Sequence, residues 1–189
     1  MVKPDSESLR DEIVRVLLVE DCPDHAELIR VKLQRSRRLR AEVTHAEQLE
    51  AGLEKLREDR FDVVLLDFSL PDSFGLETFR RAHAVAKGVP IIVLTSLDDN
   101  DLAVQAVREG AQDYLIKREA DTRLLVRSIL YAIERQTAEE ALRDSEERYA
   151  IAVRGANDGL WDWDLEADRI FYSPRWKSML GFSVGDIGD

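Results

Sequence analysis

The sequence of 189 residues has one cysteine, few prolines and no long apolar run, and each shortage narrows what the chain can be. The lone cysteine, Cys22, cannot form an internal disulfide, which fits a reducing compartment. No apolar stretch reaches the roughly 20 residues that a membrane-spanning helix needs. The opening residues, MVKPDSESLRDE, lack the apolar core of a secretion signal. We therefore expect a cytoplasmic globular protein.

Positive charge is also scarce. The chain has 27 Lys and Arg against 38 Asp and Glu, which gives a net charge of −11. This balance argues against nucleic acid or an anionic membrane as the main partner. The segment 30–40 is an exception, because it contains five arginines and a lysine. We interpret it as a solvated helix end and loop, and a docking patch for an acidic partner is the alternative.

Short aliphatic runs alternate with amphipathic segments along residues 13–123, which follow a polar leader, residues 1–12. The runs predict five buried strands, at residues 16–19, 43–45, 63–66, 89–94 and 114–116. Helices are predicted near residues 26–33, 49–56, 76–84 and 102–107, the last one capped by the turn Asp98-Asp99-Asn100 and ended by Gly110. This repetition predicts a flavodoxin-like α/β fold, a five-stranded parallel sheet of order 2-1-3-4-5 with helices on both faces.

Chemically useful side chains follow four of these strands. Glu20 and Asp21 follow the first strand and Asp67 follows the third, and in this strand order the two strands are neighbours at the position where ligands bind. Three adjacent carboxylates repel one another unless a divalent cation is present, and oxygen ligands suit Mg²⁺. Thr95 and Lys117, after the fourth and fifth strands, add a hydroxyl and a cation. Together these groups predict phosphoryl transfer to an aspartate.

Five features appear in a characteristic order: Glu20-Asp21, the pattern Asp67-x-x-Leu70-Pro71-x-x-x-Gly75, the pair Thr95-Ser96, the stretch Gly110-Ala111-x-Asp113-Tyr114, and Lys117. With these features, residues 13 to about 130 resemble a receiver domain of a two-component response regulator. The match is specific because all five features fall on the appropriate elements.

The resemblance implies a role for each acidic residue. Asp67 would accept a phosphoryl group from a phosphohistidine on a sensor histidine kinase or phosphotransfer protein. Mg²⁺ would be bound by Asp21, Asp67 and the backbone carbonyl of Ser69, while Glu20 would contribute largely through water.

The resemblance also implies a switch. Lys117 would pair with the phosphoryl oxygens, Thr95 would turn its hydroxyl towards them, and Tyr114 would move inward. The charge added by phosphorylation would bias the face formed by the fourth helix, the fifth strand and the helix that follows this strand from residue 124. Arg118 departs from the family pattern, in which proline usually follows the lysine, so the geometry of this loop stays open.

Other interpretations compete with this one. The acidic residues could be ordinary loop acids, with Asp67 a helix cap. The same fold could house a flavin site or a haloacid-dehalogenase-like phosphatase, although the phosphatase would have an acidic residue where this chain has Ser69. The histidines His25, His45 and His83 lack metal-ligand spacing, and we interpret them as surface or packing residues.

Residues 124–153 form an uninterrupted, charge-rich helical pattern. A heptad-like seam runs through it at Tyr131, Arg135, Ala138, Leu142, Ser145, Tyr149 and Ala152. We predict that this helix, the last of the receiver domain with its extension, forms a homodimer. A solvated helical linker is the alternative.

Residues 154–189 contain all three tryptophans and predict two strands, near 160–165 and 170–172, and a helix near 175–180. This stretch resembles the N-terminal part of a PAS sensory domain. The chain as a whole is predicted to be a phosphoacceptor signalling module and not a dedicated enzyme. The alternatives are the regulatory part of a diguanylate cyclase, phosphodiesterase or hybrid kinase, and a scaffold receiver that is never phosphorylated.

Overall fold

The computed structural model describes residues 13–96, 100–156, 159–183 and 185–186. It divides into two compact units, Met1–Ala138 and Glu139–Asp189. The predicted leader, residues 1–12, lies outside the described residues, as do Asp98 and Asp99 of the predicted capping turn.

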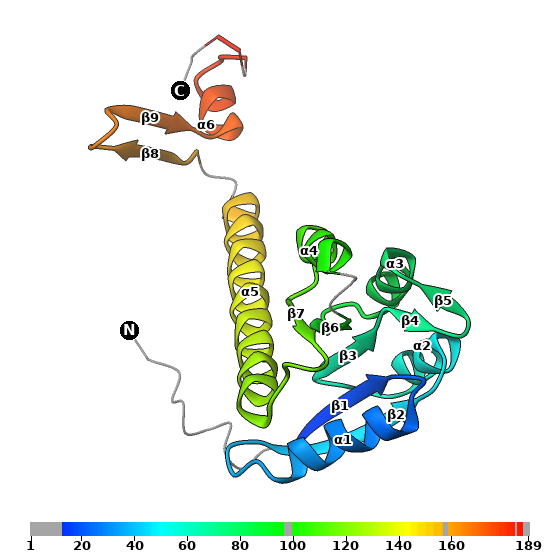
Figure 1. Ribbon diagram of the computed structural model, residues 1–189. Coiled ribbons are helices and arrows are strands. Elements are labelled where there is room, and N and C mark those ends of the chain that lie inside the picture. Colours follow the sequence, from blue (N-terminus) through cyan, green and yellow to red (C-terminus); the bar gives the residue numbers. More distant parts are fainter. Residues whose placement is uncertain (1–12, 97–99, 157–158, 184, 187–189) are drawn as a thin grey trace. The chain divides into compact units, whose positions relative to one another are not determined.

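The first unit is built on a parallel five-stranded sheet (Figure 1). Its strands lie in the spatial order β2-β1-β3-β6-β7. In chain order they are β1 (Ile13–Val19), β2 (Arg40–Ala46), β3 (Val63–Asp67), β6 (Ile91–Thr95) and β7 (Asp113–Ile116). The connecting helices are α1 (Pro23–Gln34), α2 (Leu49–Glu58), α3 (Leu76–Val85) and α4 (Asn100–Arg108), and α5 (Thr122–Ala156) follows the last strand. The predicted α/β fold is thereby confirmed, with each strand within a few residues of its expected position.

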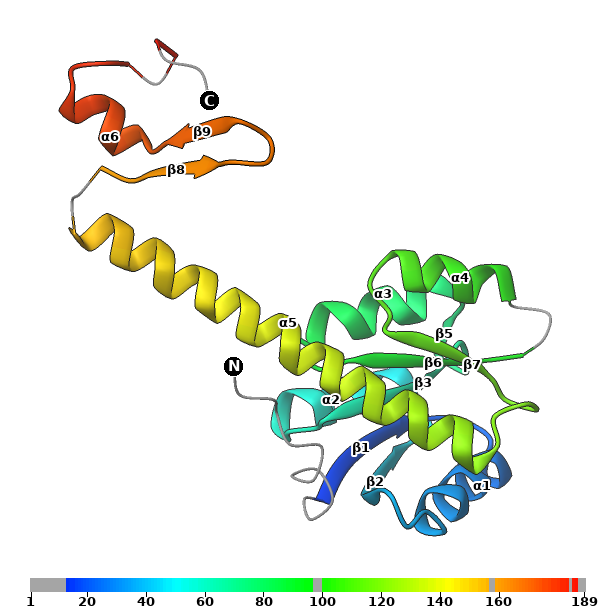
Figure 2. The ribbon, with the colours of Figure 1, turned by 90° about the vertical axis from the view of Figure 1, so that its left-hand side faces the viewer.

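Helices cover both faces of the sheet, which explains why its central strands read as continuous aliphatic runs. Along β1, Val16 and Leu18 face α1 and α5, whereas Leu17 and Val19 belong to the cluster on the opposite face. The second cluster contains residues of α2, α3 and α4, and the two layers are visible in Figure 2. Every residue of β3 and β6 is buried. Each large aliphatic side chain buried in this way contributes about 1.5–3 kcal/mol.

A small antiparallel hairpin after β3 was not predicted. It pairs β4 (Ser69–Leu70) with β5 (Ser73–Phe74). The turn between them contains Asp72, whose carboxylate accepts hydrogen bonds of 2.9 Å from the backbone N–H groups of Leu49 and Glu50. The hairpin therefore caps the first turn of α2 from a distant part of the chain.

The predicted end of α4 agrees with the structure. Gly110 has a φ of +114°, a conformation that side-chain-bearing residues rarely adopt. The N–H of Ala111 donates to the carbonyl of Ala106 at 2.9 Å, which satisfies one carbonyl of the last helical turn.

The second unit contains the later part of α5, a hairpin and a short helix. The hairpin pairs β8 (Trp161–Asp164) antiparallel with β9 (Arg169–Tyr172), and α6 (Pro174–Met179) follows. Ser173 caps α6 by accepting a 3.2 Å hydrogen bond from the N–H of Trp176, whose ring stacks on Tyr172. The three elements predicted here are therefore present.

None of the helices in the described ranges combines the length and the apolarity that crossing a membrane requires.

Candidate metal and phosphoryl site

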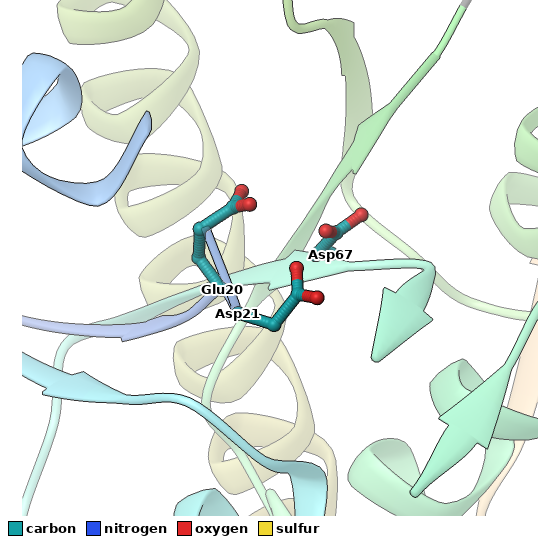
Figure 3. A group of neighbouring side chains, drawn as sticks. All are labelled: Glu20, Asp21 and Asp67. Carbon is teal, nitrogen blue, oxygen red and sulfur yellow. The ribbon is translucent and has the colours of Figure 1, made fainter. Parts of the chain in front are cut away.

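Three carboxylates meet at the carboxyl edge of the sheet, where Figure 3 shows Glu20, Asp21 and Asp67 side by side. Glu20 directly follows β1, and Asp67 is the last residue of β3. One oxygen from each of the three groups lies within 4.8 Å of the others. Glu20 and Asp67 are buried, whereas Asp21 is exposed. The three side chains predicted to gather from two neighbouring strands therefore do so.

Lys117 joins this cluster from the end of β7. Its ammonium group donates to Asp67 Oδ2 at 2.6 Å and to Glu20 Oε1 at 2.9 Å. Burial alone would lower the pKa of Lys117, but the hydrogen bonds to the two carboxylates outweigh it and raise the pKa above its ordinary value. Lys117 is therefore a fixed positive charge at the centre of the site.

The two buried carboxylates have opposite pKa shifts. Burial raises the pKa of Asp67, and the nearby negative charge of Glu20 adds to this shift, while the hydrogen bond from Lys117 partly opposes it. Burial would also raise the pKa of Glu20, but hydrogen bonds to His25 and Lys117 together lower it. Asp67 is thus the carboxylate whose negative charge is least well compensated by protein groups alone.

Two histidines contact Glu20, so the interpretation of them as surface or packing residues is incomplete. His25 Nδ1 lies 2.6 Å from Glu20 Oε2, and His45 Nε2 lies 2.7 Å from the backbone oxygen of Glu20. His25 is on the first turns of α1, five residues after Glu20, and that short spacing was the available sequence signal. The third histidine, His83, stacks on Phe79 in α3.

The remaining predicted residues surround the cluster. Thr95 ends β6 and is buried, and its hydroxyl donates to the Ser96 carbonyl at 3.1 Å. The backbone N–H of Ser69 donates to Asp67 Oδ1 at 3.1 Å. Tyr114 lies on β7, half-buried against the core cluster that includes α4.

The loop after Lys117 is held by hydrogen bonds in the absence of a proline. The N–H groups of Glu119 and Ala120 donate to the Ile116 carbonyl at 2.9 and 3.0 Å. From α1, Lys32 Nζ donates to the Ala120 carbonyl at 2.6 Å. Arg118 itself is exposed. The loop thus has a defined path that places Lys117 at the carboxylates.

The donor set fits a small, hard divalent cation. The ligand atoms on hand are carboxylate oxygens, with one exposed residue, Asp21, at the solvent side. Mg²⁺ prefers such oxygen ligands and retains several waters. A bound cation would also offset the repulsion between Glu20 and Asp67.

The fold and this site define a class of protein: a parallel α/β domain with carboxylates, an ammonium and a hydroxyl at its ligand-binding edge, suited to phosphoryl transfer. Residues 16–128 match the family model described as response regulator receiver domain. The chain belongs to this family. Receiver domains are signalling modules of two-component systems that receive phosphoryl groups from histidine kinases and typically use Mg²⁺ at an acidic site.

Curated relatives share the receiver region. The methanogenesis regulatory protein FilR1 of Methanothrix harundinacea is 39% identical over 110 residues, covering 57% of this chain and 24% of FilR1. The transcriptional regulatory protein ZraR of Klebsiella oxytoca is 34% identical over 106 residues, covering 56% of this chain and 23% of ZraR. The chain thus spans about a quarter of the length of these relatives.

Solved structures give the same family. A response regulator receiver domain protein from Clostridium thermocellum is 27% identical, with a TM-score of 0.59. The match covers 66% of this chain and 98% of that protein. The whole of a receiver domain therefore aligns with part of this chain.

Proposed function

We propose that Asp67 is the phosphoacceptor of this receiver domain and that the chain relays its phosphorylation state. The observation that carries the proposal is the contact of 2.6 Å between Lys117 and a buried Asp67 whose pKa is raised. The ammonium group of Lys117 then faces the carboxylate that would receive the phosphoryl group. Asp21 lies in the same cluster at the solvent side.

In the proposed step an Asp67 carboxylate oxygen forms a bond to phosphorus while the bond between phosphorus and the donor histidine nitrogen breaks. The imidazole leaves with the electron pair of that bond. Lys117 then pairs with the phosphoryl oxygens, and its position between Asp67 and Glu20 requires little movement. A bound Mg²⁺ would supply positive charge that neutralises the phosphoryl group.

The residues proposed to hold Mg²⁺ are Asp21, Asp67 and the Ser69 carbonyl, with Glu20 acting through water. The hydrogen bonds that His25 and Lys117 make to Glu20 favour this indirect role.

The proposed switch moves two side chains. The Thr95 hydroxyl gives up its hydrogen bond to the Ser96 carbonyl and donates to a phosphoryl oxygen instead. The movement of the Thr95 side chain leaves space that favours an inward position of Tyr114. Since Thr95 and Tyr114 lie on the adjacent strands β6 and β7, the change is transmitted to the face that carries α4 and α5.

The output is proposed to involve a dimer of α5 helices. Tyr131, Leu142 and Tyr149 are 70%, 61% and 59% exposed, and their spacings of eleven and seven residues put them on one side of the helix. Aromatic and aliphatic side chains repeated in this way favour burial against a second helix.

The proposed organisation is a receiver core at residues 13–123, a helical linker at residues 124–153 and part of a PAS domain at residues 154–189. The hairpin of β8 and β9 supports this, because Trp161 and Trp163 on one side of β8 are 57% and 48% exposed. Such a face requires further chain or a partner to cover it. ZraR is named as a transcriptional regulatory protein and FilR1 as a methanogenesis regulatory protein, and control of transcription is the proposed output of the whole protein.

Phosphorylation is tested by incubating the chain with acetyl phosphate and Mg²⁺ and measuring the intact mass. The wild type is expected to gain one phosphoryl group and Asp67→Asn none. Asp62 directly precedes β3, which Asp67 ends, so Asp62→Asn is the matched control. This variant is expected to be phosphorylated as the wild type is. An unmodified wild type, or an undiminished product on Asp67→Asn, contradicts the proposal.

A further inference from the structure

A groove between α5 and the loop that follows α1 gathers arginines from two distant parts of the chain. Its volume is about 560 Å³. Arg37 and Arg38 come from the loop, and Arg123 and Arg127 come from α5. We call this surface the arginine groove. In the arginine groove, two arginines of the basic segment 30–40 lie beside two arginines of α5.

The arginine groove is basic and partly apolar. Val126 and Leu130 line it beside Tyr131, and Glu134 is its one acidic lining residue. In the described part of the chain, the four arginines of the groove make no salt bridge with an acidic residue. In a chain of net charge −11, a cluster of arginines without a salt bridge to another described residue attracts acidic groups.

The same chain contains an acidic amphipathic helix. Residues 139–150 of α5 have five carboxylates, at Glu139, Glu140, Asp144, Glu146 and Glu147, against two arginines. Leu142 and Tyr149 form an exposed apolar pair within it. An acidic helix with an apolar stripe is the chemical complement of a basic groove with an apolar lining.

The part of α5 that lines the groove and residues 139–150 are successive stretches of one helix, Thr122–Ala156, while Arg37 and Arg38 belong to the loop after α1. We propose that residues 139–150 of a second copy occupy the arginine groove, and that each copy provides both a groove and a helix. This inference rests on the dimer of the proposed function and specifies its interface.

A reciprocal interface of this kind fixes the direction of the helices. If the partner's Leu142 packs beside Tyr131, the two-fold axis also places Leu142 beside the partner's Tyr131. This pairing requires antiparallel α5 helices. A parallel coiled coil in register would instead place Leu142 beside the partner's Leu142 and leave the groove empty.

Disulfide trapping distinguishes the two directions. In a Cys22→Ser background, Tyr131→Cys and Leu142→Cys are made separately, mixed and oxidised. Antiparallel docking is expected to give the mixed dimer as the main product, because a disulfide needs Cα atoms about 4.4–6.8 Å apart. A Leu142→Cys homodimer as the main product overturns the docking and leaves the dimer of the proposed function intact.

Charge reversal tests the arginine groove itself. Arg123→Glu/Arg127→Glu is expected to raise the dimer dissociation constant at least tenfold in sedimentation, and adding Glu146→Arg/Glu147→Arg is expected to restore most of the loss. Arg60→Glu/Lys87→Glu, which reverses two exposed charges elsewhere, is the matched control and is expected to leave the constant unchanged.

The outcomes separate the inference from the proposed function. A charge-reversed variant that dimerises like the wild type refutes the docking alone. A wild type that stays monomeric at all concentrations refutes both the docking and the dimer, whereas phosphorylation of Asp67 is measured independently of either.

Discussion

Replacing Lys117 by Met removes the only ammonium group that contacts Asp67 among the described residues. The substitution preserves much of the side-chain length but leaves two buried carboxylates, Asp67 and Glu20, without their shared cation. Removing one partner of a buried ion pair costs about 3–5 kcal/mol, and water access can reduce the loss. Because Lys117 is 22% exposed, we expect the free energy of unfolding to fall by about 3 kcal/mol at pH 7.5 without divalent cations.

The loss should depend on pH. The ordinary pKa values of Asp67 and Glu20 are 3.8 and 4.5. Without Lys117, burial and the charge of Glu20 raise the pKa of Asp67 further, and Glu20 loses one of the two hydrogen bonds that lower its pKa. The folded variant therefore binds protons more readily than the folded wild type. The cost of a raised Asp67 pKa is absent below the ordinary value, grows as the pH rises above it, and is complete above the raised value. The variant is therefore expected to lose less stability at pH 5 than at pH 7.5.

Mg²⁺ should reduce the same deficit, since it replaces the lost positive charge at the three carboxylates. Urea unfolding followed by circular dichroism, with EDTA or with Mg²⁺, measures each free energy. Lys87→Met, which removes an exposed lysine, is the matched control and is expected to change stability by less than about 0.5 kcal/mol. A loss below about 1 kcal/mol for Lys117→Met, or one that neither Mg²⁺ nor acid diminishes, would refute the reasoning.

Two further predictions concern the supports of the site. Asp72→Ala removes the carboxylate that caps Leu49 and Glu50 and is expected to lower the unfolding free energy by about 1 kcal/mol. Burial would raise the pKa of Asp72, but these backbone hydrogen bonds outweigh it and lower the pKa. The contribution of Asp72 to stability is therefore present above its ordinary pKa of 3.8 and is lost as the pH falls through the lowered pKa. An Asp72→Asn variant whose stability in acid equals that of the wild type relative to neutral pH would contradict this. Gly52→Ala places a Cβ 2.8 Å from a methyl carbon of Val19 and is expected to cost about 1–3 kcal/mol, measured by urea unfolding. An unchanged unfolding midpoint would show that Val19 moves aside freely.

The predictability of the site differs between its parts. Glu20, Asp21 and Asp67 could be placed together because they stand at the ends of two aliphatic runs, and parallel strands bring their carboxyl ends to one edge. The contact between His25 and Glu20 was missed, because it depends on the direction in which α1 leaves the strand and on two side-chain rotamers. The cap that Asp72 provides to α2 was missed for a similar reason, since the two segments are more than twenty residues apart.

The sequence by itself determined the alternation of strands and helices, the acidic residues at the strand ends and the long final helix. These features follow from periodicity and from the preferences of neighbouring residues, which act over a few positions of the chain. Only the tertiary structure decided that Lys117 lies between Glu20 and Asp67, 97 and 50 residues away, and that arginines from α5 join those after α1. Such contacts depend on how whole elements pack, because a shift of a few ångströms between two helices or strands separates groups whose own sequences are unchanged.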